Sequence, residues 1–203
     1  MTGPRVSTEY QRRGIDCAIL ENEHLRVEVL TGKGGDVTEI RDRRTDVNVL
    51  FEAPHEWRPL EDGPAGAPDA TFAYLDHYPG GWQDVLPAAG GPADVAGAPL
   101  ALHGETPISA WSVESATATE EAAELTIALT LSRYPFHVER TLSLPAGESQ
   151  VRVDERVENR GEVAVDYSWL QHVALGRPLV GPEARLDVPC ERVLVDTDET
   201  NPN

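Results

Sequence analysis

The clearest strand pattern in the chain is Leu125-Thr126-Ile127-Ala128-Leu129-Thr130-Leu131, in which large apolar side chains alternate with threonine and alanine. Successive side chains of a β-strand point to opposite faces, so this period of two predicts a strand with one buried face. After a break at Tyr134-Pro135, further strands are expected over residues 138–144 and 150–158. The turn Pro145-Ala146-Gly147 separates them and indicates antiparallel pairing.

The same period extends outward in both directions. Asn159-Arg160-Gly161 turns the chain into a strand expected over residues 163–173, and residues 25–29 alternate as Leu-Arg-Val-Glu-Val. A glycine-rich turn at residues 32–35 and a strand at 37–40 complete a hairpin, and another short strand is expected at 48–51. No segment has a convincing helical stripe. The chain is therefore expected to be all-β, as an antiparallel sandwich or a barrel.

Length and charge restrict the class of protein. The 203 residues fit one β-domain, expected over residues 15–203 after a flexible polar segment at 1–14. A net charge of −18 repels phosphate backbones and anionic lipids, so neither nucleic acid nor membrane is expected as a partner. We see no signal peptide and no apolar run of about 20 residues, and we expect the two distant cysteines to be free thiols. These features predict a cytoplasmic protein.

Residues 52–103 differ from the rest of the chain. They hold eight of its 16 prolines, yet five aromatic residues are spread among them: Trp57, Phe72, Tyr74, Tyr78 and Trp82. Aromatic residues are scarce in disordered linkers. We therefore expect an ordered long connection, with one or two short strands, that lies over one face of a sheet.

Two motifs combine tryptophan with polar side chains: Gly80-Gly81-Trp82-Gln83-Asp84-Val85-Leu86-Pro87 and Trp169-Leu170-Gln171-His172-Val173-Ala174-Leu175-Gly176. Indole faces pack on the C–H faces of sugar rings, while amides, carboxylates and imidazoles bond the hydroxyl groups. The motifs predict a carbohydrate site in which Trp82, Gln83, Asp84 and Trp169 bind substrate and His172 transfers protons.

Each of these residues also has a plainer interpretation. Trp82 could anchor a loop, and His172 could be a core or edge histidine bonded to a carbonyl. Strict alternation puts His172 on one face with Leu170 and Ser168, and Trp169 and Gln171 on the other.

A second candidate segment is His103-Gly104-Glu105. The glycine permits close approach of the backbone to a ligand, and Glu105 could orient the imidazole of His103. His77 lies in the aromatic connection and could line the same cleft. The sequence has no HExxH, no paired CxxC and no phosphate-binding loop, so we expect neither a metal nor a cofactor.

Taken together, the motifs resemble the aldose 1-epimerase (galactose mutarotase-like) superfamily. The matching segments are residues 20–37, 80–87, 102–105, 145–161 and 167–176. The resemblance implies a large antiparallel β-sandwich with a sugar cleft, and interconversion of the α and β anomers of a free aldose without a cofactor. It also implies that His172 is the general acid and that His103 is the second histidine of the site.

One part of the resemblance is missing. Members of the superfamily are longer than this sequence, and their glutamate base comes from a late strand. Here Glu183, Glu191 and Glu199 have no supporting context. Three explanations stay open: the chain is a fragment with strands missing from its sandwich, Glu105 or Asp84 substitutes, or catalysis has been lost.

These inferences lead to one spatial requirement and several functions. We expect Trp82, His103 and His172 to converge on one hollow wide enough for a pyranose. The favoured function is an aldose 1-epimerase-like isomerase acting on a monosaccharide. The alternatives are a non-catalytic carbohydrate-binding module, a structural β-domain and, more distantly, a cupin-like barrel. The sequence does not define an oligomeric state.

Overall fold

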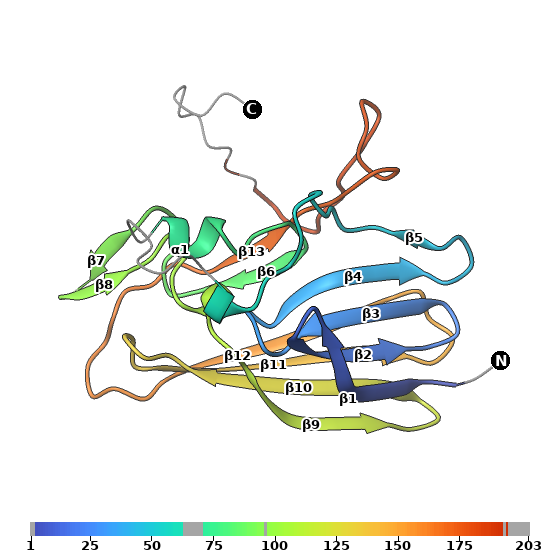
Figure 1. The fold of residues 1–203 in the computed structure, drawn as a ribbon, viewed down its shortest axis with the longest axis horizontal. Coiled ribbons are helices and arrows are strands. Elements are labelled where there is room, and N and C mark those ends of the chain that lie inside the picture. Colours follow the sequence, from blue (N-terminus) through green and yellow to red (C-terminus); the bar gives the residue numbers. More distant parts are fainter. Residues whose placement is uncertain (1–2, 63–70, 96, 193, 195–203) are drawn as a thin grey trace.

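The computed structural model describes residues 3–62, 71–95, 97–192 and 194, and its β-strands form two main layers (Figure 1). The first layer is a seven-stranded sheet in the order β1-β2-β3-β4-β6-β13, with β5 paired to β4. All its strand pairs are antiparallel. Its strands are β1 (Arg5–Arg12), β2 (Ile15–Glu21), β3 (Leu25–Leu30), β4 (Asp36–Asp42), β5 (Val47–Asn48), β6 (Trp82–Val85) and β13 (Leu170–Val173).

The second layer is a four-stranded antiparallel sheet in the order β12-β11-β10-β9. Its strands are β9 (Ser112–Ala118), β10 (Ala122–Thr130), β11 (Phe136–Pro145) and β12 (Arg152–Asn159). The strands expected at 125–131, 138–144 and 150–158 therefore exist within three residues of the predicted bounds. The predicted all-β antiparallel sandwich is confirmed.

The core lies between the two sheets, where the alternating apolar side chains meet. Leu125 and Ile127 of β10 and Leu142 of β11 are fully or almost fully buried there, opposite Val27 and Val29 of β3. Burying apolar side chains on the inner face of each sheet is the main stabilising contribution to such a sandwich. One inward position breaks the pattern, because it is occupied by the fully buried Arg140.

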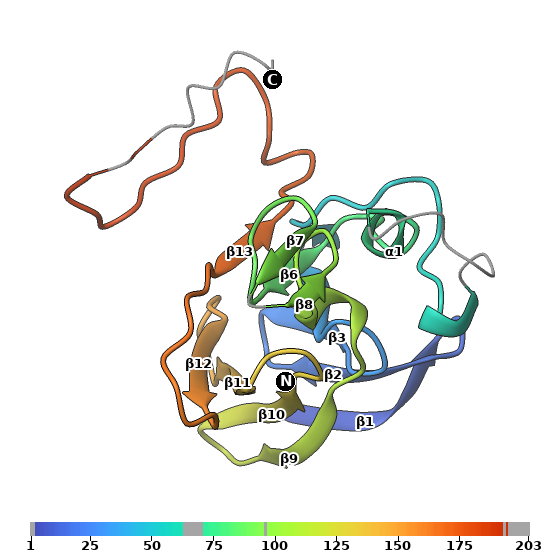
Figure 2. The same ribbon diagram turned by 90° about the vertical axis from the view of Figure 1, so that its left-hand side faces the viewer.

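The long connection is ordered over its described residues, and it forms short helices and strands. It contains η1 (Leu60–Asp62), α1 (Phe72–Leu75), β7 (Ala93–Val95) and β8 (Ala98–Leu100), and it also supplies β6 to the large sheet. A further short helix, η2 (Thr106–Ile108), follows it. Figure 2 shows α1, β6, β7, β8 and β13 gathered at one end of the molecule, away from β9 and β10. We call the face of the large sheet that points away from the second sheet the outer face.

Three expectations need correction. Within the segment 1–14, expected to be flexible, residues 5–12 form β1 and pair with β2. This strand is mostly exposed, so its sequence lacks the apolar alternation that announces a strand. The strand expected at 163–173 is shortened to Leu170–Val173. The strand expected at 48–51 is reduced to Val47–Asn48 and a single bridge at Leu50. In the described part of the chain, no helix has both the length and the apolar character needed to span a membrane.

Candidate functional site

Two histidines from distant parts of the sequence meet on the outer face. His172 lies on β13, His103 lies in the loop after β8, and their ring centroids are 5.6 Å apart. His103 has a left-handed backbone (φ 63°) and is followed by Gly104 at φ 75°. A Cβ at Gly104 would lie 2.5 Å from the carbonyl oxygen of Leu86, so this glycine lets the loop approach the chain just after β6.

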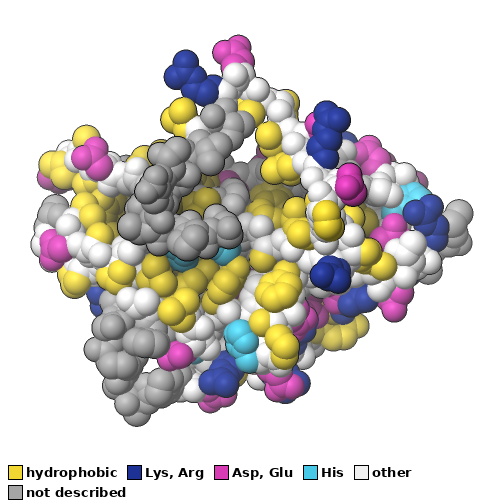
Figure 3. Space-filling model, turned by 90° about the horizontal axis from the view of Figure 1, so that it is seen from above, with side chains coloured by type: hydrophobic (Ala, Val, Ile, Leu, Met, Phe, Trp, Pro, Cys, Tyr) yellow, Lys and Arg dark blue, Asp and Glu magenta, His cyan; other side chains and the backbone are white. Residues whose placement is uncertain are grey.

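Two tyrosines from the turn at α1 complete a histidine–tyrosine cluster of Tyr74, Tyr78, His103 and His172. The Tyr78 hydroxyl lies 3.2 Å from Nδ1 of His172, with the two rings edge to face. Tyr74 packs edge to face on His103 with centroids 4.6 Å apart, and it stacks on Tyr78. Figure 3 shows hydrophobic side chains gathered on the molecule's upper face, with histidine side chains among them.

Burial and neighbouring charge set the protonation of the cluster. Burial lowers the pKa of His103, and the nearby His172 lowers it further. Two imidazoles this close disfavour a second positive charge, so His103 is neutral near pH 7. Burial also raises the pKa values of Tyr74 and Tyr78, and both phenols stay protonated. Nδ1 of His103 is buried and has no hydrogen-bond partner among the described residues.

A buried hydrogen-bond chain supports the cluster from below. The Tyr74 hydroxyl donates to Oε1 of Gln83 at 2.6 Å, and Nε2 of Gln83 donates to Oδ2 of Asp36 at 3.1 Å. The ammonium group of Lys33 also donates to Asp36. All of these groups are buried, so each polar atom that makes a bond avoids a large desolvation cost, and Tyr74 is held in one orientation.

The predicted tryptophans lie on the other side of the sheet. In the antiparallel pair β6–β13, His172 is opposite Gln83, while Gln171 is opposite Asp84. The indole N–H of Trp82 donates to Oε1 of Gln171 at 2.7 Å, and that of Trp169 donates to Asp84. Trp82, Asp84 and Trp169 therefore lie on the inner side of the sheet, where Asp84 is buried and Trp169 stays exposed at the edge.

The structure thus brings His103, His172 and Gln83 together on the outer face, but not Trp82. The expectation of a single hollow shared by Trp82 and both histidines is not met. The physical reason is strand alternation: Trp82 is one residue from Gln83, so it must point to the opposite face. The expected division of β13, with His172 on one face and Trp169 and Gln171 on the other, is confirmed.

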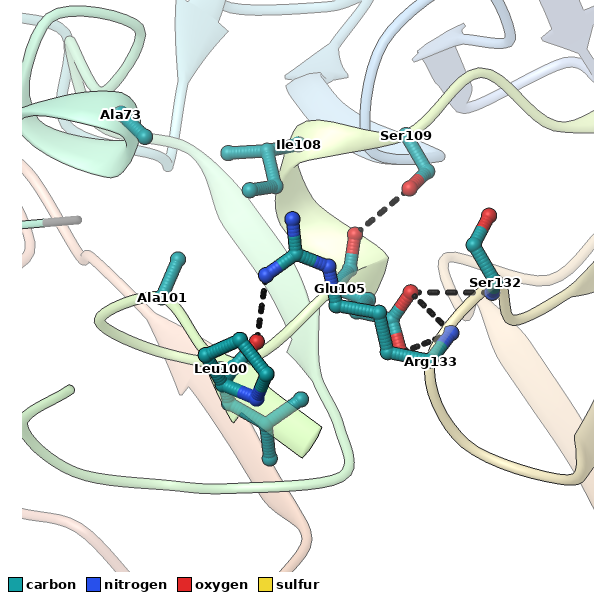
Figure 4. A pocket seen from close by; sticks show the side chains of 10 residues that line it. Ala73, Leu100, Ala101, Glu105, Ile108, Ser109, Ser132 and Arg133 are labelled. Carbon is teal, nitrogen blue, oxygen red and sulfur yellow. Dashed lines mark hydrogen bonds between the residues drawn. The ribbon is translucent and has the colours of Figure 1, made fainter. Parts of the chain in front are cut away.

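Glu105 and His77 have structural partners outside the cluster. The Glu105 carboxylate accepts hydrogen bonds from the backbone N–H groups of Ser132 and Arg133, at 2.9 and 3.1 Å (Figure 4). It lines a cavity of about 380 Å³ next to Leu100 and Ile108. The ring nitrogens of His77 lie 3.3 and 3.2 Å from the carbonyl oxygens of Ala73 and Pro59.

Sequence reasoning missed Tyr74, Tyr78, Gln171, Arg140 and Glu155. A signal existed for two of them. Arg140 occupies an inward position between Val138 and Leu142, and Glu155 occupies one between Val153 and Val157. A charged residue at an apolar position of an alternating strand indicates a buried charge. The tyrosines gave no such signal, because the turn that carries them has no period.

The described residues contain no group of three or more histidine, cysteine or acidic side chains that could hold a metal ion. The histidine–tyrosine cluster itself offers two imidazoles and two phenols. The imidazoles can donate and accept protons near neutral pH, and aromatic ring faces can pack against an apolar surface of a ligand.

The comparisons with known proteins agree with this architecture. The family model of a domain of unknown function, DUF4432, matches residues 12–203. No curated protein matches the chain. The solved structure of the Slr1438 protein from Synechocystis is similar, with a TM-score of 0.61 and 18% identity over 86% of this chain and 59% of that one. A galactose mutarotase-like protein from Lactobacillus casei has a TM-score of 0.50 and 14% identity over 75% of this chain and 47% of that one.

The chain therefore spans less than two thirds of the length of each of these two structures. At identities this low the likeness concerns the fold, and the fold is a galactose mutarotase-like β-sandwich. A shared fold does not define a reaction, since function depends on the side chains of the site.

Proposed function

The chain belongs to the DUF4432 family, and we propose that this member binds a free aldose at the histidine–tyrosine cluster and interconverts its α and β anomers. One observation carries the proposal: the imidazoles of His103 and His172 lie side by side on the outer face, with the Tyr78 hydroxyl on Nδ1 of His172. Two neighbouring imidazoles provide an acid and a base for one ring opening.

In the proposed reaction, His172 is the general acid. The Tyr78 hydroxyl lies 3.2 Å from Nδ1 of His172 and holds the ring so that Nε2 points away from Tyr78. In the protonated ring that the proposed step requires, Nδ1–H donates to the Tyr78 oxygen and Nε2–H is free to face the sugar. Nε2–H protonates the ring oxygen of the sugar while the bond from that oxygen to the anomeric carbon breaks. Protonation of the departing oxygen stabilises the transition state by removing a developing negative charge.

His103 is the proposed general base. Its lowered pKa keeps it neutral near pH 7, so it can remove the proton of the anomeric hydroxyl as the carbonyl forms. We assign this step to Nε2, because Nδ1 is buried. After rotation about the bond between the first two carbons, the same transfers in reverse close the ring on either face. The proton count is unchanged over the cycle.

The ring face of Tyr78 is proposed to pack against the sugar, with the buried Tyr74 stacked behind it. This replaces the role expected for Trp82, which faces the interior. The protein's negative charge favours a neutral sugar over a phosphorylated one.

Polarimetry of freshly dissolved α-glucose or α-galactose tests the proposal. We expect a rate above that of buffer, reduced at least about 100-fold in His172→Ala and in His103→Ala. The exposed His24 supplies the matched control, His24→Ala, which is expected to keep the wild-type rate. Wild-type activity in either cluster variant would remove that histidine from the mechanism.

A second function is favoured by one observation. Asp84 and Glu105, which one of the three open explanations put in place of the missing base, are bonded elsewhere. In the described part of the chain, no carboxylate makes a hydrogen bond or an ion pair with His103 or His172. The alternative is therefore a sugar-binding module without catalysis. Sugar-dependent tryptophan fluorescence together with a rate equal to that of buffer would support it.

A further inference from the structure

The interior side of β13 makes polar contacts that the proposed sugar site does not use. Nε2 of Gln171 donates to Oδ1 of Asp84 at 2.9 Å and to Oε2 of Glu155 at 2.8 Å, and its Oε1 accepts from Trp82. Gln171 is thus held by groups from β6 of its own sheet and from β12 of the other sheet. We call these contacts the Gln171 clamp.

The clamp is attached to a buried ionic group. Nε of Arg140 lies 3.1 Å from Oε1 of Glu155, and its guanidinium carbon lies 5.1 Å from the centroid of the Trp82 ring. The charged groups facing Glu155 are Arg140 on β11 and Asp84 on β6, and Asp36 on β4 acts in turn on Asp84. Glu155 and Asp84 together outnumber the single cation Arg140, so this group carries an excess negative charge when both acids are ionised.

We propose that Glu155 is a positioning residue for His172, acting through Gln171. Gln171 and His172 are consecutive on β13, so their side chains project from opposite faces of one strand. Among the described strands, β13 pairs only with β6 and is four residues long. Such a short edge strand frays easily, and contacts that fix the exposed Gln171 on the inner side of β13 also fix His172 on its outer side. This inference rests on the proposed function for its catalytic consequence, although the clamp itself does not.

Glu155 also makes the clamp sensitive to pH. Burial raises the pKa of Glu155 to about 7; the charge of Asp84 adds to the rise and Arg140 opposes it. A carboxylate accepts a stronger hydrogen bond than a neutral carboxyl group does. The bond from Gln171 is therefore expected to strengthen as the pH rises through about 7, when Glu155 loses its proton.

The test compares Glu155→Gln with Glu158→Gln in the full chain, because Glu158 lies on the same strand but pairs with Arg160 at the surface. The chain has four tryptophans, so the indole N–H resonances in an NMR titration from pH 5.5 to 8.5 are few. We expect the Trp82 and Trp169 resonances to shift with a midpoint near pH 7 in the wild type and in Glu158→Gln. That midpoint should vanish in Glu155→Gln.

Hydrogen exchange of the β13 backbone amides provides the second readout. At pH 8, exchange at residues 170–173 is expected to be at least about threefold faster in Glu155→Gln than in the wild type. Gln171→Leu removes the clamp but keeps Glu155, and it should show the same increase. This second variant keeps the test decisive if Glu155→Gln folds poorly. An unchanged midpoint in Glu155→Gln, or unchanged β13 exchange in Gln171→Leu, would overturn the proposal.

Kinetics separate this inference from the proposed function. If the wild type interconverts anomers, Glu155→Gln should lower kcat about tenfold and leave KM within about twofold, because Glu155 does not touch the sugar. A wild type with no activity would contradict the proposed function. The NMR and hydrogen-exchange results would still show whether the Gln171 clamp fixes β13. An active Glu155→Gln variant with wild-type kcat would count against the positioning role.

Discussion

Tyr78 is the residue whose side chain connects the long connection directly to the candidate acid. Its hydroxyl reaches Nδ1 of His172 at 3.2 Å from a turn that lies 94 positions away in the sequence. A partner on one ring nitrogen fixes the orientation and the tautomer of an imidazole, and so decides which nitrogen faces the substrate. In the proposed mechanism, Tyr78 therefore positions the ring and His172 transfers the proton.

Replacing Tyr78 with phenylalanine tests this assignment. Tyr78→Phe keeps the ring that packs on His172 and removes only the hydroxyl, so we expect kcat to fall about tenfold with little change in KM. The exposed Tyr10 on β1 provides the control Tyr10→Phe, which should behave as the wild type. Polarimetric progress curves over a range of sugar concentrations measure both constants. An equal loss in the two variants would contradict a specific role for Tyr78.

The coupling between the two imidazoles yields a prediction that needs no sugar. His172 lowers the pKa of His103 by charge repulsion, in addition to the effect of burial. His172→Gln removes the charge, so the pKa of His103 should rise toward its ordinary value while remaining below it. Histidine ring resonances followed by NMR against pH measure this shift. The same experiment on His24→Gln should leave the His103 titration unchanged, and an unshifted His103 in His172→Gln would show that the rings do not interact.

At the level of elements, β6 and β13 act as a partition between two polar environments. Gln83 and His172 face outward and join the histidine–tyrosine cluster, whereas Asp84 and Gln171 face inward and join Arg140 and Glu155. The loop that carries His103 packs against the end of β6, where the backbone N–H groups of Glu105 and Thr106 donate to the carbonyl oxygen of Leu86. The site therefore depends on how closely that loop approaches β6.

Gly104→Ala tests this close approach. An alanine Cβ would meet the Leu86 carbonyl oxygen at 2.5 Å, so the loop must shift and carry His103 away from His172. Gly97→Ala is the matched control, since Gly97 also has a positive φ (83°) but has no atom within 4 Å of the added Cβ. Both variants incur a backbone strain of about 1–2 kcal/mol, and only Gly104→Ala adds the clash. Thermal unfolding and sugar titration should both be affected more strongly in Gly104→Ala.

The extent to which sequence predicts these elements follows from the period of two. Alternation at residues 125–131 and 150–158 reveals strands because one face of each meets the apolar core and the other meets water. The same period of two correctly placed His172 on the opposite face from Trp169 and Gln171. The exposed strand β1 carries no such contrast. Pairing between β6 and β13 joins residues about 90 positions apart. No local pattern encodes that register, so the separation of Trp82 from the histidines became visible only in the structure.

At the scale of the whole molecule, Arg140 connects the two layers. It originates on β11 of the smaller sheet, donates to the carbonyl oxygen of Gly35 in the turn between β3 and β4, and lies over the Trp82 ring of β6. A fully buried guanidinium needs compensating charge, which Glu155 provides at 3.1 Å. Removing one partner of such a group leaves a buried charge without compensation.

Arg140→Met is therefore expected to destabilise the fold by about 3–5 kcal/mol, whereas Arg156→Met, at an exposed position of β12, should change stability little. The pKa values of Asp84 and Glu155 are raised in the folded state, so that state binds more protons than the unfolded chain. Their contribution to stability accordingly falls as the pH rises through about 7. Without Arg140 the loss of stability with rising pH is larger. The free energy of unfolding, measured with urea, should therefore lie further below the wild-type value at pH 8 than at pH 5. An equal loss of unfolding free energy at both pH values would show that Arg140 does not stabilise the charges of the two acids.

The adjacency of Gln171 and His172 has a thermodynamic consequence. If a sugar seated against His172 favours one arrangement of β13, and the ionisation state of Glu155 favours the same one, the two equilibria are linked and the linkage is reciprocal. An uncharged sugar would then bind with an affinity that varies with pH, and its binding would be accompanied by proton exchange with the buffer. Calorimetric titrations in buffers of different ionisation enthalpy would reveal that exchange as a buffer-dependent heat.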